Sequence, residues 1–67
     1  MLQIYLNGEE KQIPNDLDMA GLIELLELTD QRIAVEVNEE LVPRSTFSGH
    51  QLKADDRIEI IQAVGGG

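Results

Sequence analysis

One stretch of helical periodicity interrupts a chain whose other apolar residues alternate with period two. In residues 19–26, apolar side chains recur at the spacing i, i+3, i+4 and i+7, which places them on one face of a helix. Asp18 precedes this stretch and is of a residue type favoured at a helix N-cap. Gly21 stands where a glutamate would complete a capping box, so it weakens the expected helix start. The pattern predicts one helix that ends near Leu28 or Thr29.

The segments before and after this helix have the pattern of β-strands. Leu2–Leu6 alternates and is followed by Asn7-Gly8, a dipeptide favoured in type I′ hairpin turns because both positions need positive φ. Further strands are expected through residues 12–13 and at 33–37, 41–42 and 57–63. A helix between a hairpin and later strands must cover one face of the sheet to bury its apolar stripe. The order therefore predicts an α+β fold of the β-grasp (ubiquitin-like) type.

This layout has defined consequences for the domain. We expect a mixed sheet of four to five strands packed on one helix, with the first, last and third strands adjacent and central. Residues 1–63 are expected to form the β-grasp domain. Residues 64–67 are expected to form a flexible C-terminal tail.

Size and charge limit the classes of function. A chain of 67 residues buries a thin core that can hardly wall a substrate pocket, which favours a binding module or carrier over an enzyme. The formal net charge is −8 and the few basic residues are scattered. Nucleic acid and anionic membranes are therefore not expected as partners, whereas a basic or apolar protein partner is favoured.

The chain has no cysteine, which excludes a disulfide framework and a Cys-based metal site. Its first residues lack the basic and apolar regions of a signal peptide, and no apolar run approaches the length of a membrane span. We therefore expect a cytoplasmic protein with no metal and no bound cofactor.

The sequence ends in the three glycines Gly65–Gly67, directly after the last predicted strand. Residues 64–67 in extended conformation would reach roughly 13 Å beyond the sheet. Because glycine has no Cβ, such a segment can lie in a narrow channel and bring its terminal carboxylate to the active site of a partner enzyme. A frayed terminus without function is the alternative interpretation.

The chemistry open to a terminal carboxylate is limited. A carboxylate is a poor electrophile, but adenylation by ATP converts it to a mixed anhydride that sulfur or nitrogen nucleophiles attack. A persulfide donor would give a thiocarboxylate, and a lysine amine would give an isopeptide bond. In both cases the partner supplies the catalytic groups and Gly67 supplies the acyl group.

An apolar docking surface is predicted beside the base of this tail. Alternation places Tyr5, Ala34, Ile61 and Ala63 on the sheet face that points away from the helix. If the strands that carry them are central neighbours, these side chains gather next to Val64. Such a patch is typical of a partner interface, although single apolar residues on a surface are ordinary.

Other polar residues do not make a convincing catalytic site. His50 lies near Ser45 and Ser48, but a lone histidine without an acidic partner is more often a loop residue bonded to backbone. Arg44 is either a contact for an acidic partner or simply solvated. The pair Asp55-Asp56 lacks the further oxygen ligands of a calcium loop and predicts a turn. No catalytic residue is therefore assigned to this chain.

Several segments of the sequence resemble the ThiS family of sulfur carriers in thiamine biosynthesis. The resemblance covers essentially the whole chain. It is carried by Leu2–Gly8, Val35–Asn38, Val42-Pro43-Arg44, Phe47, His50, Asp56–Ile60 and Gly66-Gly67. The terminal glycines are shared by all activated ubiquitin-like carriers, whereas the Val-Pro-Arg segment with the following aromatic residue and histidine is more specific.

The resemblance implies a defined cycle. An E1-like adenylyltransferase would activate Gly67 with ATP, and a cysteine desulfurase or other persulfide donor would convert it to the thiocarboxylate. A thiazole synthase would then accept the sulfur. Gly65, Gly66 and Gly67 would thread the active sites of these partners, and Gly67 would be the modified residue.

Three positions depart from the family pattern. Asn38-Glu39 replaces a common Asn-Gly, so a looser hairpin is expected there. Asp55-Asp56 replaces a common Gly-Asp, which would force Asp55 towards a left-handed conformation. Gly65 extends the diglycine end and adds ordering entropy on docking. Three alternatives stay open at this point: a sulfur carrier for molybdopterin synthesis, a ubiquitin-like protein modifier, and an interaction domain with an incidental glycine tail.

Overall fold

The computed structural model describes residues 1–62 of the chain. The order of elements is that expected from the sequence, with a short 3₁₀ helix in the polar stretch between the fourth and fifth strands. The elements are β1 (Leu2–Leu6), β2 (Glu9–Ile13), α1 (Met19–Leu25), β3 (Ile33–Val37), β4 (Glu40–Val42), η1 (Arg44–Thr46) and β5 (Arg57–Gln62). The predicted boundary between domain and tail, at residues 63 and 64, lies outside the described residues.

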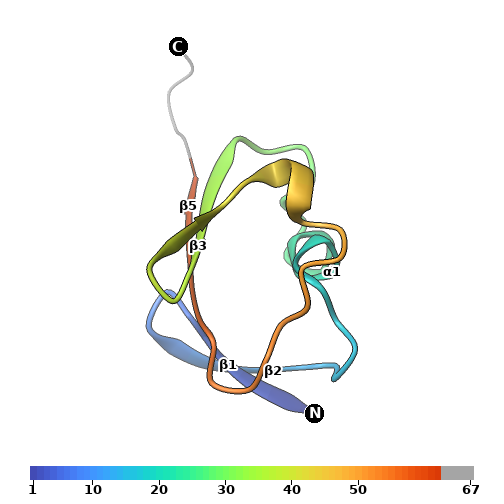
Figure 1. The fold of residues 1–67 in the computed structure, drawn as a ribbon, viewed down its shortest axis with the longest axis vertical. Helices are drawn as coiled ribbons and strands as arrows, with labels where there is room; N and C mark the ends of the chain where they lie inside the picture. Colours follow the sequence, from blue (N-terminus) through green and yellow to red (C-terminus); the bar gives the residue numbers. More distant parts are fainter. Residues whose placement is uncertain (63–67) are drawn as a thin grey trace.

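The five strands form one mixed sheet in the order β2-β1-β5-β3-β4. β1 runs parallel to β5, whereas the β1–β2, β3–β4 and β3–β5 pairs are antiparallel. The first, last and third strands are thus adjacent and central, as predicted. Figure 1 shows α1 on one side of this sheet, with β5 and β3 side by side. The α+β, β-grasp fold class is confirmed.

The core lies between the helix and the inner face of the sheet. Its residues are contributed by the helix, by every strand and by the loop before β5. The buried apolar residues are Ile4, Ile13, Met19, Leu22, Ile23, Val35, Val37, Val42, Phe47, Leu52 and Ile58. On the scale of about 1.5–3 kcal/mol for each fully buried large side chain, this cluster is the main source of stability.

The helix begins as the sequence predicts. The carboxylate of Asp18 accepts a hydrogen bond from the Gly21 amide at 2.8 Å, so Asp18 is the N-cap. A Cβ placed on Gly21 would lie 2.6 Å from Cδ1 of Leu17. A larger residue at position 21 would therefore displace the Leu17 side chain, which lies over Gly21.

The helix ends at Leu25, earlier than the predicted end near Leu28 or Thr29. Glu27 adopts φ 60°. Its amide bonds to the carbonyl of Glu24 at 3.0 Å, and the amide of Leu28 bonds to the carbonyl of Ile23 at 2.9 Å. These bonds form a Schellman C-cap with glutamate in the position that usually holds glycine. Helical periodicity in the sequence continues past the residue at which the backbone reverses, so it overestimates the helix length.

Positive φ values occur at the turns that the sequence singles out. Asn7 and Gly8 have φ 50° and 86°, as the predicted type I′ turn requires. Asn38 and Glu39 have φ 52° and 71°, and the β3–β4 register continues up to the residues that flank them. The hairpin is therefore tight, and the expectation of a looser one is wrong. Asp55 has φ 67°, which confirms its predicted left-handed conformation.

Within residues 1–62, no helix has the length and apolar character needed to cross a membrane. In the same part of the chain, no group of three or more His, Asp or Glu side chains is arranged to hold a metal ion.

Candidate functional site

The candidate site begins where β5 ends. β5 is a central strand, and its pairing with β3 continues to the Ile33↔Gln62 pair at its last residue. In Figure 1, this end of β5 lies at the end of the molecule opposite the N-terminus. The predicted tail residues Gly65, Gly66 and Gly67 lie outside the described residues. The chain therefore reaches its C-terminal segment from a strand that is fixed in the sheet.

A side chain extends the support of β5 beyond β1. The amide of Asn7 bonds to the carbonyl of Ile58 at 2.8 Å, which is the last backbone bond from this part of the chain to β5. The side chain of Asn7 then accepts a hydrogen bond from the Ile60 amide at 2.9 Å and donates one to the Ile60 carbonyl at 3.4 Å. The Asn7 carboxamide therefore acts as one more rung of the parallel ladder.

The predicted docking residues do not all meet. Ala34 lies directly opposite Ile61, and both side chains are exposed on the outer sheet face. Ile61 is 61% exposed. Ala63 and Val64 lie outside the described residues. Ala34 and Ile61 are therefore the only two of the predicted docking residues that the described part of the chain brings together.

Tyr5 lies apart from this pair. It is half-buried and pairs with Arg57, four residues before Ile61 on β5, which corresponds to roughly 13 Å along a strand. Between the positions of Tyr5 and Ile61 along the sheet, Glu59 of β5 lies opposite Glu36 of β3. Alternation correctly places Tyr5 on the outer face, but the register of the parallel β1–β5 pair separates it from the exit of the chain.

Sequence reasoning missed this opposed pair of glutamates. Like charges directly across a pair of strands are unfavourable, and here they flank the exposed Ala34–Ile61 pair. Their facing positions depend on the β3–β5 register, for which the sequence gives no local signal. The outer face therefore combines apolar and acidic character beside the exit of β5.

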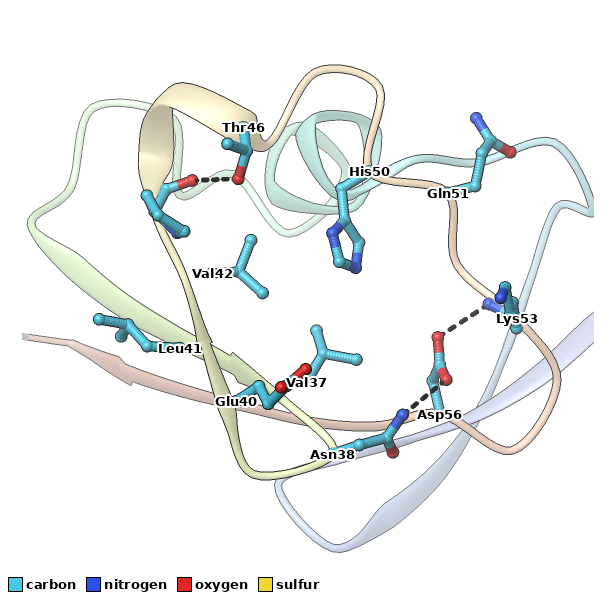
Figure 2. A pocket seen from close by; sticks show the side chains of 11 residues that line it. Val37, Asn38, Glu40, Leu41, Val42, Thr46, His50, Gln51, Lys53 and Asp56 are labelled. Atoms are coloured by element: carbon cyan, nitrogen blue, oxygen red, sulfur yellow. Dashed lines mark hydrogen bonds between the residues drawn. The ribbon is translucent and has the colours of Figure 1, made fainter.

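A hollow lies near the other end of β5, beside Asp56, and contains His50. Its volume is about 330 Å³, and it is lined by the β3–β4 hairpin and the loop that leads to β5. Figure 2 shows the imidazole of His50 pointing into this hollow. Neither Ser45 nor Ser48 is among its lining residues, so the structure does not support a serine–histidine pair.

One charged group that lines this hollow, Asp56, has structural partners. Asp56 is only 8% exposed; its carboxylate accepts hydrogen bonds from the Lys53 amide at 2.8 Å and from the Asn38 side chain at 3.1 Å. Figure 2 shows both bonds. Asp56 therefore fixes the turn before β5, in agreement with the predicted turn at Asp55-Asp56.

Arg44 is also structural. Its guanidinium donates to the carbonyls of Thr29 at 3.2 Å and Gln31 at 2.6 Å, and it lies 5.8 Å from the ring centroid of Phe47. The residue thus joins η1 to the segment after the helix, by backbone bonds and a cation–π contact. It is therefore not simply solvated.

Asp18 joins the helix to the loop that holds His50. Its second carboxylate oxygen accepts from the Gly49 amide at 3.0 Å. The hydrogen bonds from Gly49 and then from Gly21 favour the ionised form and hold the pKa of Asp18 below its ordinary value. This carboxylate serves the fold rather than catalysis.

A β-grasp domain whose central last strand leads into a glycine-rich C-terminal segment defines the class of ubiquitin-like carriers. The ThiS sequence family matches this chain over residues 4–67. The chain therefore belongs to the ThiS family.

Individual relatives agree with this assignment. The sulfur carrier protein ThiS of Escherichia coli is 27% identical over 66 residues, which cover 98% of this chain and 100% of that protein. The crystal structure of the thiamine biosynthesis protein ThiS from Geobacter metallireducens superposes with a TM-score of 0.83 at 25% identity, and the match covers 98% of this chain and 100% of that one. A thiazole synthase of Magnetococcus marinus is 35% identical over 66 residues, which are 98% of this chain but 20% of the synthase.

Proposed function

We propose that this chain is a sulfur carrier that bears sulfur as a thiocarboxylate on Gly67 and donates it for thiazole formation in thiamine biosynthesis. The observation that carries the proposal is the family match. It covers residues 4–67, which include the strands of a β-grasp domain and Gly67. The chain acts as a carrier and co-substrate, and not as an enzyme.

The proposed cycle needs two activated forms of the terminus. The Gly67 carboxylate attacks ATP, forming an acyl adenylate and releasing pyrophosphate. The terminal sulfur of a persulfide then displaces AMP. A thiol next attacks the donor's sulfur in the acyl disulfide, which forms a disulfide with the donor and releases the thiocarboxylate. ATP is thus a substrate of the partner enzyme. Because the chain has no cysteine, its C-terminus is the only place for the carried sulfur.

Three classes of partner follow from this cycle: an E1-like adenylyltransferase, a cysteine desulfurase or other persulfide donor, and a thiazole synthase. Relatives named thiazole synthase that contain a segment similar to this chain support the last of them. The Ala34–Ile61 pair and residues 63–64 are proposed to dock on these enzymes. We propose the cytoplasm as the location of this cycle.

Intact mass measurement tests the proposal. The chain is incubated with an adenylyltransferase, ATP and a persulfide donor, and the expected product has one oxygen replaced by sulfur. A matched chain with one bulky residue added after Gly67 should not be converted, because the added side chain blocks the channel, while its melting temperature stays unchanged. Adducts on other proteins would indicate a modifier instead, and conversion of the extended chain would contradict the role of Gly67.

The acceptor enzyme distinguishes the pathway. The thiocarboxylate form should lose its sulfur to a thiazole synthase together with the substrates of ring formation. Transfer to a molybdopterin synthase subunit, and not to the thiazole synthase, would contradict the proposed pathway while leaving the carrier chemistry intact.

A further inference from the structure

The last residues of β5 have a neighbouring strand on only one side. The register between β1 and β5 ends at Leu6↔Ile58, whereas pairing with β3 continues to Gln62. In Figure 1, β5 continues past the β1–β2 turn with β3 beside it. The side chain of Asn7 supplies one further rung at Ile60. Beyond that rung, no residue in the described part of the chain pairs with the edge of β5 that faces away from β3.

The backbone of Gln62 points towards this open edge. Asn38 donates its amide to the carbonyl of Arg57 at 2.8 Å, so the odd-numbered residues of β5 bond towards β3. Even-numbered residues bond the other way, as the contact from the Asn7 amide to the Ile58 carbonyl shows. The alternation directs both the N–H and the C=O of Gln62 away from β3, one rung past the Asn7 side chain.

A cavity of about 240 Å³, in which four of the six lining residues are apolar, lies beside the same edge. Its walls come from the end of β1, the end of β5 and the segment that closes the helix. The lining residues are Leu6, Asn7, Leu26, Leu28, Ile60 and Gln62. The four apolar ones are half-buried and pack against the core. A strand added along β5 would direct alternate side chains towards this cavity.

The residues that follow Gln62 in the sequence are poorly suited to fill the cavity. They are Ala63, Val64 and the three glycines Gly65–Gly67. To lie along the open edge, the chain would have to reverse at Ala63 and Val64, and the returning segment would consist of glycines. Glycine has no side chain to occupy an apolar cavity. The cavity therefore suits an apolar side chain of another protein better than these residues.

The rim of the cavity is acidic. Glu9 lies opposite Leu6 in the β1–β2 register, and Glu27 stands between the lining residues Leu26 and Leu28. Both glutamates are exposed, and the whole chain carries a formal charge of −8. A segment with a branched apolar side chain flanked by basic residues complements this surface.

We propose that a thiazole synthase adds an extended, basic segment to the open edge of β5 and inserts one branched apolar side chain into the cavity. Main-chain bonds to Gln62 give affinity, and the cavity gives specificity, as in other cases of strand addition. The added strand fixes the direction of the chain at the point where it leaves the sheet. This inference rests on the proposed function and names how one of its partners is held.

Three substitutions at Gln62 separate the two parts of the proposal. Gln62→Ala keeps the N–H but shortens a side chain that lines the cavity and bonds to Gln31, so it is the reference against which the other two variants are compared. Gln62→Pro removes the N–H at the open edge and leaves the Ala34–Ile61 rung intact; it should weaken binding about tenfold. Gln62→Phe keeps the N–H and fills the cavity, and should also weaken binding about tenfold. Titration calorimetry with a purified thiazole synthase measures all three, and melting temperatures confirm that each variant is folded.

Amide hydrogen exchange supplies a second measurement on the unmodified chain. The Gln62 amide should exchange freely in the isolated protein and become protected in the complex. Equal binding by the three variants, or protection of this amide in the isolated protein by the chain's own C-terminus, would overturn the proposal. If the chain takes up and transfers sulfur but the proline and phenylalanine variants bind normally, the strand-addition proposal is wrong and the proposed function still holds. If no sulfur is taken up, the proposed function itself fails.

Discussion

The two hairpin turns of the sheet each place an asparagine against β5, but they hold its two ends in different ways. Asn7 and Asn38 have nearly the same backbone conformation, with φ 50° and 52°. Asn38 bonds to the Arg57 amide and to the Asp56 carboxylate, at the start of the strand. Asn7 bonds to Ile60, close to the end.

The surroundings of the two contacts differ. At the start of β5, Asp56 is nearly buried and also accepts from the Lys53 amide, so Asn38 belongs to a closed network of hydrogen bonds. The bonds of Asn7 are exposed and lie next to an open strand edge. The comparison indicates that the start of β5 stabilises the fold, whereas its end is held by exposed bonds, beside an edge with which no other described residue pairs.

The largest loss of stability is expected for Asn38→Gly. Glycine tolerates the positive φ, so the change isolates the side-chain bonds. The Asp56 carboxylate loses a partner while nearly buried, and the free energy of unfolding should fall by about 2 kcal/mol. Urea denaturation measures the change. A loss no greater than that of Asn7→Gly would contradict the proposed division between the two ends of β5.

A smaller loss of stability is expected for Asn7→Gly. The exposed Ile60 amide and carbonyl can bond to water once the carboxamide is gone, so unfolding should become easier by about 1 kcal/mol. Amide exchange should accelerate at Ile60 but not at Arg57. Equal acceleration at both residues would show that the two ends of β5 open together.

Ile61→Asp should change stability by less than about 0.5 kcal/mol, because the Ile61 side chain is mostly exposed. It should weaken binding to the adenylyltransferase about tenfold by placing a charge in an apolar contact. Leu25→Asp is the matched control, since Leu25 is exposed on the helix, on the other side of the sheet. Loss of the fold in Ile61→Asp would overturn the assignment of its face.

The smallest effect concerns Asp18. Its folded-state pKa is lowered, so its contribution to stability is present above the unfolded pKa of about 3.9 and is lost as the pH falls through the folded value. Acid unfolding of Asp18→Asn should therefore show a weaker pH dependence below pH 4 than that of the parent chain. Identical acid profiles would show that the Gly49 and Gly21 bonds do not depend on its charge.

Periodicity predicts elements and faces well in this chain, because the single helical stripe and the alternating strands each bury one side. It also predicts the turn at Asn7-Gly8, since the required backbone conformation favours these residue types. It does not predict that the Asn7 side chain reaches Ile60, which is 53 positions away in the sequence. Contacts of this kind depend on where β1 stops relative to β5.

The alternation of apolar residues also does not predict the register between strands. Alternation assigns Tyr5, Ala34 and Ile61 to the same face, and the structure agrees. The expectation that they cluster fails for Tyr5, because a parallel pair has no connecting turn that fixes its offset. The end of the helix is overestimated for a related reason: Glu27 leaves the helical conformation without a glycine to mark the position.

The central claim is that the carried group is on the last residue. Fragmentation of the sulfur-loaded chain in a mass spectrometer tests it directly. The account predicts that the exchange of oxygen for sulfur is found in every fragment that contains Gly67 and in none that lacks it. Sulfur on an internal fragment, or a loaded chain whose C-terminal fragment has its ordinary mass, would contradict it.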